Sequence, residues 1–370
     1  MARTALIISG GTARGAYAAG LLNGLFTRFP ELHRAVSIFS GTSTGSLIAP
    51  ALALYCLDPA RHHELLELIV RRYQVPSTEA FVDEPKTWRW RLVRWLVARF
   101  KDDDAGRAVG MLGETGAVVD ASPLWRTVEA EYTDGRLSEL FAARDRVQVY
   151  VNCVSAQTGG LVAFSSADEA MTPARYRKAI FASCMQPFFM PLVPLDFPPG
   201  GPQELMDGGV RDVVPVEAAF YGGATRALAL ALFPDGDGVP AEGSFAGRAN
   251  LLRLAERVVL GLLDAEVMDD DVLQARLLAT IGRLVQYARA HGADAATLGE
   301  LVRLLRPEEQ AQFLGEGVFH ALYVHRPSRD VPLVETLRWD AEGMRASIEA
   351  GRAVASGEEG RKMYDFLMAG

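Results

Sequence analysis

The sequence predicts an α/β fold, in which a mainly parallel sheet is covered by helices, and three observations carry this prediction. Short apolar runs of strand character alternate with longer runs of helical spacing through the first part of the chain. Glycine-rich turns follow two of the short runs, where parallel strands pass into their covering helices. Hydrophobic residues make up 49% of the 370, which is enough apolar material for a large core.

The alternation can be followed element by element from the amino end. Strands are expected over residues 4–9, 35–40, 147–155 and 226–233, and the first two helices over 16–29 and 46–57. In an open sheet of this kind, ligands bind at the carboxyl ends of the strands. Two glycine-rich turns, 9–17 and 41–45, fall at such ends.

The remainder of the chain is predominantly helical. Residues from about 58 to 125 are charged and poor in strand signal, which indicates a helical cap inserted into the core. HALYVHRP (320–327) predicts a last strand. We therefore expect a core over 1–240 that includes the cap, a helical region over 241–318, and over 319–370 a return strand and a helical tail that pack on the core.

Composition and charge argue against several classes of protein. The formal net charge of −8 speaks against non-specific nucleic-acid binding, and no apolar run reaches the length of about 18 residues that predicts a transmembrane helix. The start, MARTALIISGG, lacks the long apolar segment and cleavage site of a secretory signal, so we expect a cytoplasmic protein. The three scattered cysteines, Cys56, Cys153 and Cys184, imply neither a disulfide framework nor a zinc site.

The first glycine-rich turn, SGGTARGAY (9–17), lies between an expected strand and an expected helix. Backbone N–H groups at a helix amino terminus form a ready anion site. The turn lacks the Gly-Lys-Ser/Thr ending of a phosphate loop, and Thr12 stands where a dinucleotide fingerprint needs its second glycine. The pattern therefore argues against nucleotide binding and leaves the N–H groups for another anion.

The second turn, GTSTG (41–45), places Ser43 between two glycines at the junction of an expected strand and helix. A serine on such a tight turn projects its hydroxyl from the apex. The turn leaves no room for side chains on the neighbouring residues, which fits Gly41 and Gly45. If both turns lie at the same sheet edge, N–H groups of the first face the hydroxyl of the second. This is the arrangement of a nucleophile beside an oxyanion hole.

A reactive serine needs a base, and the sequence leaves two kinds open. Six histidines are present: His33, His62, His63, His291, His320 and His325. His33 precedes the second strand, at the wrong edge, and only His320 and His325, near the expected last strand, stay candidates. The other kind is a carboxylate: Asp207 stands before Gly208 and Gly209, a sequence that also suits a simple tight turn.

Several motifs, in order, resemble those of the patatin-like phospholipase family. The family carries a G-G-G-x-R/K-G loop, a G-x-S-x-G turn, an A-S-x-x-x-P stretch and a D-G-G or D-G-A segment. In this chain the corresponding segments are GGTARG (10–15), GTSTG (41–45), ASCMQP (182–187) and DGG (207–209), and HRPSR (325–329) is similar to the family's late strand. The resemblance covers about residues 4–235 and that last strand.

The resemblance implies a three-layer α/β/α core and hydrolysis of lipid acyl esters through an acyl-enzyme. The implied substrates are glycerophospholipids, lysophospholipids and neutral lipid esters. By position, Ser43 is the nucleophile and Asp207 its base, in a Ser–Asp dyad that requires no histidine, metal or other cofactor. The implied oxyanion donors and the supporting residues of the motifs are Gly10, Gly11, Thr12, Arg14, Gly15, Gly41, Gly45, Gly208 and Gly209.

Thr12 departs from the family pattern, which has glycine at this position. Threonine keeps its N–H donor but resists a positive φ and adds bulk near the acyl carbon. The departure therefore predicts a weaker or differently shaped oxyanion hole. Arg14, the charged member of the loop, is expected either to brace the turn through backbone carbonyls or to steer an anionic head group.

Residues 88–101 (WRWRLVRWLVARFK) hold three of the five tryptophans and five basic residues. On a helix, tryptophan and arginine in this arrangement suit a peripheral contact with a membrane interface, although a cap helix with outward arginines would read similarly. Two rival functions also remain. One is an α/β-hydrolase esterase with a Ser-Asp-His triad through His320 or His325, and the other is an inactive lipid-binding regulatory module, which Thr12 favours.

Overall fold

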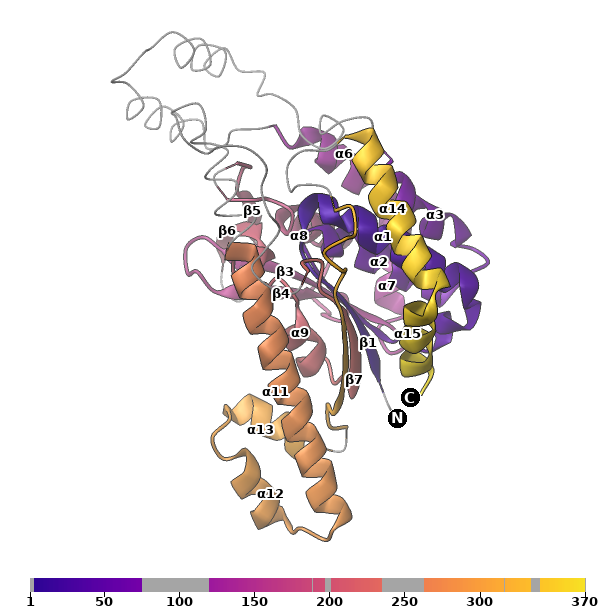
Figure 1. Cartoon of the computed structure of the whole chain (residues 1–370). Coiled ribbons are helices and arrows are strands. Elements are labelled where there is room, and N and C mark those ends of the chain that lie inside the picture. The colour runs from indigo at the N-terminus through magenta and orange to yellow at the C-terminus, as the bar shows by residue number, and fades with distance from the viewer. Residues whose placement is uncertain are drawn as a thin grey trace, which may run out of the picture.

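The computed structural model describes residues 3–74, 120–187, 189–196, 201–234, 263–315, 317–333 and 340–369. In this part of the chain, a central sheet lies between two layers of helices (Figure 1). Helices α9 and α11 cover one face, and α1, α2 and α14 cover the other. The predicted α/β class and the implied three-layer α/β/α architecture are confirmed.

The elements of the described chain follow one another in a regular order. The strands are β1 (Thr4–Ile8), β2 (Ile38–Thr42), β3 (Gln148–Ser155), β4 (Leu161–Ser165), β5 (Val193–Asp196), β6 (Pro202–Asp207), β7 (Arg226–Leu230) and β8 (Ala321–His325). The α-helices are α1 (Gly15–Arg28), α2 (Thr44–Leu57), α3 (His63–Arg71), α6 (Ser122–Glu131), α7 (Asp134–Ala142), α8 (Pro173–Ala182), α9 (Val216–Tyr221), α11 (Asp264–Ala290), α12 (Ala295–Val302), α13 (Pro307–Leu314), α14 (Ala341–Ser356) and α15 (Glu358–Met368). Short 3-10 turns are η1 (Thr12–Arg14), η2 (Pro30–Arg34) and η4 (Gly208–Val210).

The sheet has the order β5-β6-β3-β2-β1-β7-β8, with β4 paired to β3 off this path. The pairs β1–β2, β1–β7, β2–β3 and β7–β8 are parallel, whereas β4, β5 and β6 join in antiparallel fashion. The first strand of the chain therefore lies in the middle of the sheet. The glycine-rich turns that follow β1 and β2 consequently leave adjacent parallel strands at the same edge.

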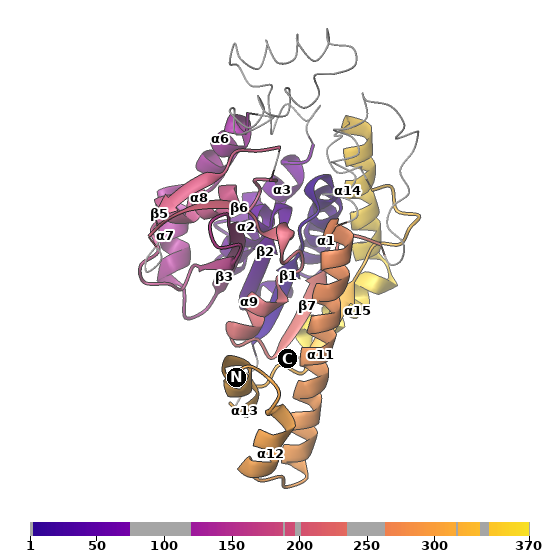
Figure 2. The ribbon, with the colours of Figure 1, turned by 90° about the vertical axis from the view of Figure 1, so that its left-hand side faces the viewer.

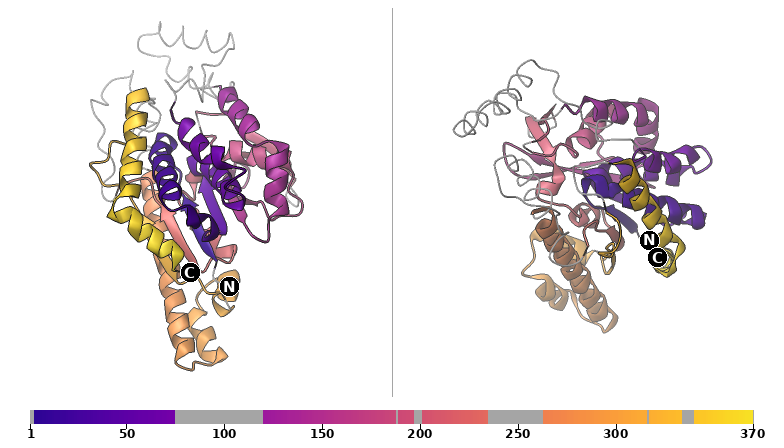
Figure 3. Two further views of the ribbon diagram at one scale, coloured as in Figure 1. Left: turned by 90° about the vertical axis from the view of Figure 1, so that its right-hand side faces the viewer. Right: turned by 45° about the horizontal axis from the view of Figure 1, so that its top comes forward.

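Two hydrophobic cores flank the sheet because successive strand residues point to opposite faces. On β1, Leu6 and Ile8 belong to the core beneath α1, α2 and α14, while Ala5 and Ile7 belong to the core beneath α9 and α11. Figure 2 shows α9 and α11 in front of the sheet. Helices α12 and α13 form a small lobe at the carboxyl end of α11 that projects beyond the sheet (Figure 3).

Helices α1 and α14 cross at very close range, and glycines make this possible. A Cβ atom on Gly20 would lie 2.1 Å from the carbonyl oxygen of Ile348, and one on Gly351 would lie 2.3 Å from the carbonyl oxygen of Tyr17. Gly24 likewise faces Ala355, at 2.7 Å from that methyl group. The contact between these two helices is the most extensive between any two described helices, so α14 braces the helix that follows the first glycine-rich turn.

The predicted strand–helix alternation is confirmed, with shifted boundaries. The second strand runs to Thr42, later than predicted, and α2 begins at Thr44, because the tight turn occupies one residue. The strand predicted over 226–233 ends at Leu230, and β8 lies within the predicted last strand. The sequence does not predict β4, β5 and β6, which are short and, in β5 and β6, interrupted by prolines and charged residues.

The expected cap is described only at its two ends, by α3 and α6. The tryptophan- and arginine-rich segment 88–101 lies outside the described residues. Among the helices that are described, none combines the length and apolar character needed to cross a membrane.

Candidate active site

Ser43 occupies a one-residue turn between β2 and α2 and is held in a strained conformation. Its φ is 53° and its ψ is −121°, in a region that residues other than glycine rarely adopt. The neighbouring positions have no room for a side chain, so glycine is required there, as the motif predicts. A Cβ atom on Gly45 would lie 2.0 Å from the Ile8 carbonyl oxygen, and one on Gly41 would lie 2.3 Å from the Gly45 carbonyl oxygen.

Hydrogen bonds on both sides of Ser43 hold this backbone in place. The Ser43 N–H donates to the hydroxyl of Ser183 at 2.9 Å. The Ser43 carbonyl accepts from the Ser46 N–H at 2.9 Å, from the Ser46 hydroxyl at 2.6 Å and from the Cys184 thiol at 3.3 Å. The surrounding structure thus fixes the conformation of a strained residue, which is typical of functional positions.

The register of the sheet brings Asp207 to the same place. Strand β2 pairs with β3 as far as Thr42, which lies opposite Asn152, and the next residue of β3, Cys153, pairs with Asp207 of β6. Strand β4 pairs with the same part of β3, so it occupies the other edge of that strand. Strand β6 therefore continues in line with β2, and the end of β6 meets the end of β2 where Ser43 begins the turn.

The Asp207 carboxyl is completely buried and held by two donors. Its Oδ1 accepts the Gly209 N–H at 2.8 Å, and its Oδ2 accepts the Gln186 side-chain amide at 2.8 Å. Burial raises the pKa of Asp207 to about 7, while the Gly209 N–H and the Ser43 hydroxyl act to lower it. The result is a carboxyl group beside Ser43 that is poised to gain or lose a proton near neutral pH.

The first glycine-rich turn passes directly beside the serine. A Cβ atom on Gly10 would lie 3.4 Å from the Cβ atom of Ser43. The Gly10 N–H, however, donates to the Val213 carbonyl at 2.9 Å, so this predicted donor is already engaged. The N–H groups of Gly11 and Thr12 have no hydrogen-bond acceptor in the described part of the chain, and they precede the amino end of α1. These two N–H groups are the ones left for a developing negative charge.

Thr12 shows the strain that its departure from glycine predicts. Its φ is 49°, in the left-handed region that a β-branched residue resists. Its hydroxyl is buried and has no hydrogen-bond partner among the described residues. The turn therefore keeps a glycine-like backbone with a threonine in it.

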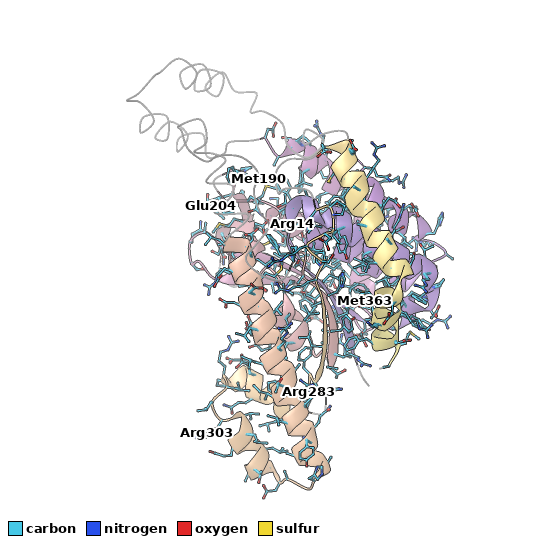
Figure 4. All side chains as sticks on the ribbon, viewed as in Figure 1. Arg14, Met190, Glu204, Arg283, Arg303 and Met363 are labelled. Carbon is cyan, nitrogen blue, oxygen red and sulfur yellow. The ribbon has the colours of Figure 1, made fainter. Side chains whose placement is uncertain are left out.

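Two other members of the first turn are enclosed. Arg14 is only 2% exposed, and its guanidinium lies over the Phe233 ring, 3.8 Å from the ring centre, near the amino end of α11 (Figure 4). A Cβ atom on Gly15 would lie 2.0 Å from the Thr44 hydroxyl, so glycine lets the two turns approach each other. Gly208 has a similar role, because its Cβ atom would lie 2.5 Å from the Asn152 carbonyl oxygen.

A further carboxyl group, that of Asp264 at the amino end of α11, lies close to Asp207. Burial, with a smaller contribution from the nearby Asp207 carboxyl, raises the pKa of Asp264 to about 8, and the Arg14 guanidinium acts in the opposite direction. At neutral pH Asp264 is therefore mostly uncharged. The sequence carries no pattern that singles out this residue.

Residues 182–187 support both Ser43 and Asp207, although sequence reasoning assigns them no role. Ser183 and Cys184 hold the backbone of Ser43, and Gln186 holds the carboxyl of Asp207. Ser183 also donates to the Asn152 carbonyl at 2.6 Å, which ties this segment to β3. The ASCMQP motif is the signal that could have found them. Its polar positions are those that contact the dyad.

Neither candidate histidine contacts the dyad in the described structure. The ring of His325 lies between the Tyr17 hydroxyl, at 2.8 Å from Nε2, and the Glu359 carboxylate, at 3.4 Å from Nδ1. His320 lies beside Gln286 and the Val318 carbonyl. Of the others, His62 pairs with Glu139, while His33, His63 and His291 contact carbonyl groups of their own neighbourhoods.

Comparison with known proteins places this site in context. No curated protein matches the chain. A structure of VipD from Legionella pneumophila aligns with 95% of this chain and 67% of its own, at 11% identity and a TM-score of 0.35. A structure of full-length SpcU in complex with full-length ExoU, from the type III secretion system of Pseudomonas aeruginosa, aligns with 96% of this chain and 78% of that chain, at 16% identity and a TM-score of 0.27.

The chain also matches a protein-family model. The model of the patatin-like phospholipases matches residues 6–220, which is more than half of the chain. The matched region includes both glycine-rich turns, the 182–187 segment and Asp207. The chain belongs to the patatin-like phospholipase family.

Proposed function

We propose that the protein hydrolyses carboxylic esters of lipids, as a phospholipase A or lysophospholipase, through a dyad of Ser43 and Asp207. One observation carries the proposal. A serine held in a strained strand-to-helix turn lies beside a buried carboxyl group whose pKa is about 7, and that serine hydroxyl is one of the groups that lower the pKa. A nucleophile with an adjacent base is the requirement for acyl transfer.

In the first half of the reaction, Ser43 Oγ attacks the carbonyl carbon of the lipid ester. Its proton passes to the Asp207 carboxylate as the new C–O bond forms, and the carbonyl oxygen becomes negatively charged. The N–H groups of Gly11 and Thr12 would stabilise this oxyanion, since both lack an acceptor among the described residues. Collapse of the intermediate breaks the original ester bond, and Asp207 returns the proton to the departing alcohol.

In the second half, water attacks the acyl group on Ser43. Asp207 accepts a proton from this water, a second oxyanion forms at the same N–H groups, and the fatty acid departs as the proton returns to Ser43 Oγ. Both halves use the same base, so its pKa must lie near the working pH. Atoms and charge balance with the ester, one water molecule and these side chains.

The rival triad has no geometric support among the described residues. Both ring nitrogens of His325 are engaged with Tyr17 and Glu359, and His320 contacts Gln286 and the Val318 carbonyl. A catalytic histidine would have to hydrogen-bond the serine.

Thr12 favours the second rival, a weak or inactive lipid-binding module. Loss of one oxyanion donor typically costs about 10²- to 10³-fold in rate. Thr12 nevertheless adopts the positive φ at which a glycine would also sit, so its N–H is still presented by the turn. The observation therefore predicts a strained but complete oxyanion hole, and only a rate measurement separates the two functions.

The test is fatty-acid release from vesicles that contain phosphatidylcholine and lysophosphatidylcholine. Wild-type protein is compared with Ser43→Ala, Asp207→Asn and the double variant His320→Gln/His325→Gln. We expect at least about a 10³-fold loss in the first two and little change in the double variant. Ser40→Ala and Asp212→Asn are the matched controls, because each removes the same group from another buried position, and the Ser40 hydroxyl has no hydrogen-bond partner among the described residues.

Each failure has a distinct meaning. Loss of release in the histidine variant, with its thermal unfolding unchanged, would establish the triad. Wild-type binding to vesicles without release, together with no labelling of Ser43 by a fluorophosphonate probe, would establish the inactive module.

A further inference from the structure

A groove of about 760 Å³ runs along the open edge of the sheet, away from Ser43 and Asp207. Strand β8 is the last strand of the sheet, and four consecutive residues, 321–324, line the groove. Helix α11 forms one wall through Arg276 and Arg283, and Phe366 of α15 contributes to the other. Figure 4 marks Arg283 on α11 beside this edge. The volume is within the range of sites for small ligands.

The charged side chains of the groove are all of one sign. Arg226, Arg276 and Arg283 line it, with His320 and the Thr280 hydroxyl, and no aspartate or glutamate is among the lining residues. None of the three arginines forms an ion pair with a carboxylate in the described chain, whose formal net charge is −8. Arginines elsewhere on the surface are commonly paired, as Arg303 is with Glu300 at 2.8 Å.

Arg226 shows most clearly that the positive charge is uncompensated. Its guanidinium lies over the Phe366 ring, 4.7 Å from the ring centre, and its Nε is buried without a hydrogen-bond partner. Partial burial without a carboxylate lowers the pKa of Arg226. Such a group is stabilised when an anion enters the groove beside it.

The edge strand adds backbone donors. The Ala321 N–H and the His325 carbonyl are both bonded toward β7. Residues of a strand alternate in the side to which they direct their backbone groups, so the N–H groups of Leu322 and Val324 point away from β7. The groove therefore presents guanidinium and backbone donors, and the ligand that satisfies them must be rich in acceptors and negatively charged.

We propose that this groove is a binding site for a ligand with at least two phosphate groups. Arginine forks bind phosphate in a bidentate manner. Arg276 and Arg283 are seven residues apart on α11, which separates them by roughly 10 Å along the helix. Across this separation, a ligand with two or more phosphate groups can place a different phosphate beside each long arginine side chain, whereas one inorganic phosphate pairs with one of them. The site is separate from the proposed hydrolytic centre and does not depend on it.

The test is isothermal titration of the full chain with inorganic tripolyphosphate at low ionic strength. We expect one tripolyphosphate to bind per chain, and the double variant Arg276→Gln/Arg283→Gln to bind at least about tenfold more weakly. The control Arg303→Gln/Arg345→Gln removes the same two charges from outside the groove and is expected to bind within about twofold of wild type. Ser43→Ala is expected to bind as wild type does, which separates this site from the dyad.

Three results would overturn the proposal: no binding by wild type, an equal loss in both double variants, or tighter groove-dependent binding of a polyglutamate peptide than of tripolyphosphate. The four arginine substitutions change exposed side chains, and unchanged thermal unfolding verifies the folding of every variant.

The source of the phosphate is decided with vesicles of phosphatidylcholine, with and without phosphatidic acid. Binding to the acidic vesicles that requires Arg276 and Arg283 and is displaced by tripolyphosphate identifies a lipid head group. Groove-dependent binding of tripolyphosphate, with vesicle binding unaffected by the two substitutions, identifies a soluble ligand. Either result supports the site.

Discussion

At the scale of single residues, Asp207 is held between burial and hydrogen bonding. Complete burial raises its pKa to about 7, and N–H donors from Gly209 and Gln186 favour its ionised form. A base with a pKa near the working pH is largely ionised and still basic enough to take the proton of a serine.

The first prediction is the pH dependence of hydrolysis. Asp207 must be ionised to accept the Ser43 proton, so kcat/KM should rise with pH and level off above a midpoint near pH 7. A soluble aryl ester is the suitable substrate, because its concentration at the enzyme does not depend on vesicle charge. A rate that stays constant between about pH 5 and pH 9 would exclude Asp207 as the base.

Gln186 is predicted to position the base and tune its pKa. In Gln186→Met the carboxyl loses one donor, so the midpoint of the pH–rate profile should move to higher pH and the rate at pH 6 should fall about tenfold. Gln157→Met is the control, because Gln157 also donates to a carboxylate, that of Glu204, at an exposed position. An unchanged midpoint in Gln186→Met would mean that Gln186 only packs against Asp207 and does not tune its pKa.

The strain at Thr12 has its own measurable consequence. Replacement by glycine removes a cost of about 1–3 kcal/mol for the positive φ and adds a smaller entropic cost, so Thr12→Gly should raise the free energy of unfolding by about 1 kcal/mol. Thr12→Ala keeps a Cβ atom and should gain less. Urea denaturation distinguishes the two variants. Equal gains in stability would mean that the buried Thr12 hydroxyl, and not the positive φ, is the source of the cost.

At the scale of secondary-structure elements, the α1–α14 crossing governs how the first turn is supported. The backbones of the two helices approach so closely that glycine at positions 20 and 351 has no substitute. Small residues four apart on each helix, Gly20 with Gly24 and Gly351 with Ala355, make this surface flat.

A pair of alanine substitutions of opposite effect tests the crossing. Gly351→Ala should destabilise the fold by about 2 kcal/mol or more, because the new methyl group would meet the Tyr17 carbonyl. Gly299→Ala, in α12 with open space around it, should stabilise by about 0.5–1 kcal/mol, because alanine is the better helix former. Denaturation of both variants shows directly whether each substitution raises or lowers the free energy of unfolding. A gain in each would mean that the helices separate without cost.

The elements also show which parts of the site can be predicted from local sequence patterns. The elbow around Ser43 and the DGG turn at Asp207 follow from short local patterns, because each depends on neighbours in the chain. Strand β6, which carries Asp207, has the polar sequence PQELMD and no strand periodicity. Its place is set by the register of β3, and the partner of Gly20 lies more than 300 residues away. Contacts between residues so far apart in the sequence produce no local sequence pattern from which they could be predicted.

At the scale of the whole molecule, the proposed base lowers the stability of the fold at neutral pH. The pKa of Asp207 is about 7 in the folded chain and near its usual value of 3.8 when unfolded. The folded state therefore holds the proton more tightly between these values, and stability falls as pH rises through this window.

The matching prediction compares wild type with Asp207→Asn. The free energy of unfolding of wild type should fall relative to that of the variant by about 3 kcal/mol between pH 5 and pH 8, since asparagine does not ionise. Chemical denaturation at several pH values measures this difference. A difference that is independent of pH would mean that the carboxyl is as well solvated in the folded chain as in the unfolded one.

The central position of β1 also has a consequence for synthesis of the chain. Ser43 and Asp207 are both translated before β7 and β8, which complete the sheet beyond β1, and before α14, which supports α1. A nascent chain that has reached residue 220 already carries both residues of the proposed dyad but lacks β7, β8 and the helix that Gly20 contacts. The order of synthesis therefore places both residues of the proposed dyad in the chain before the strands and the helix that complete their surroundings.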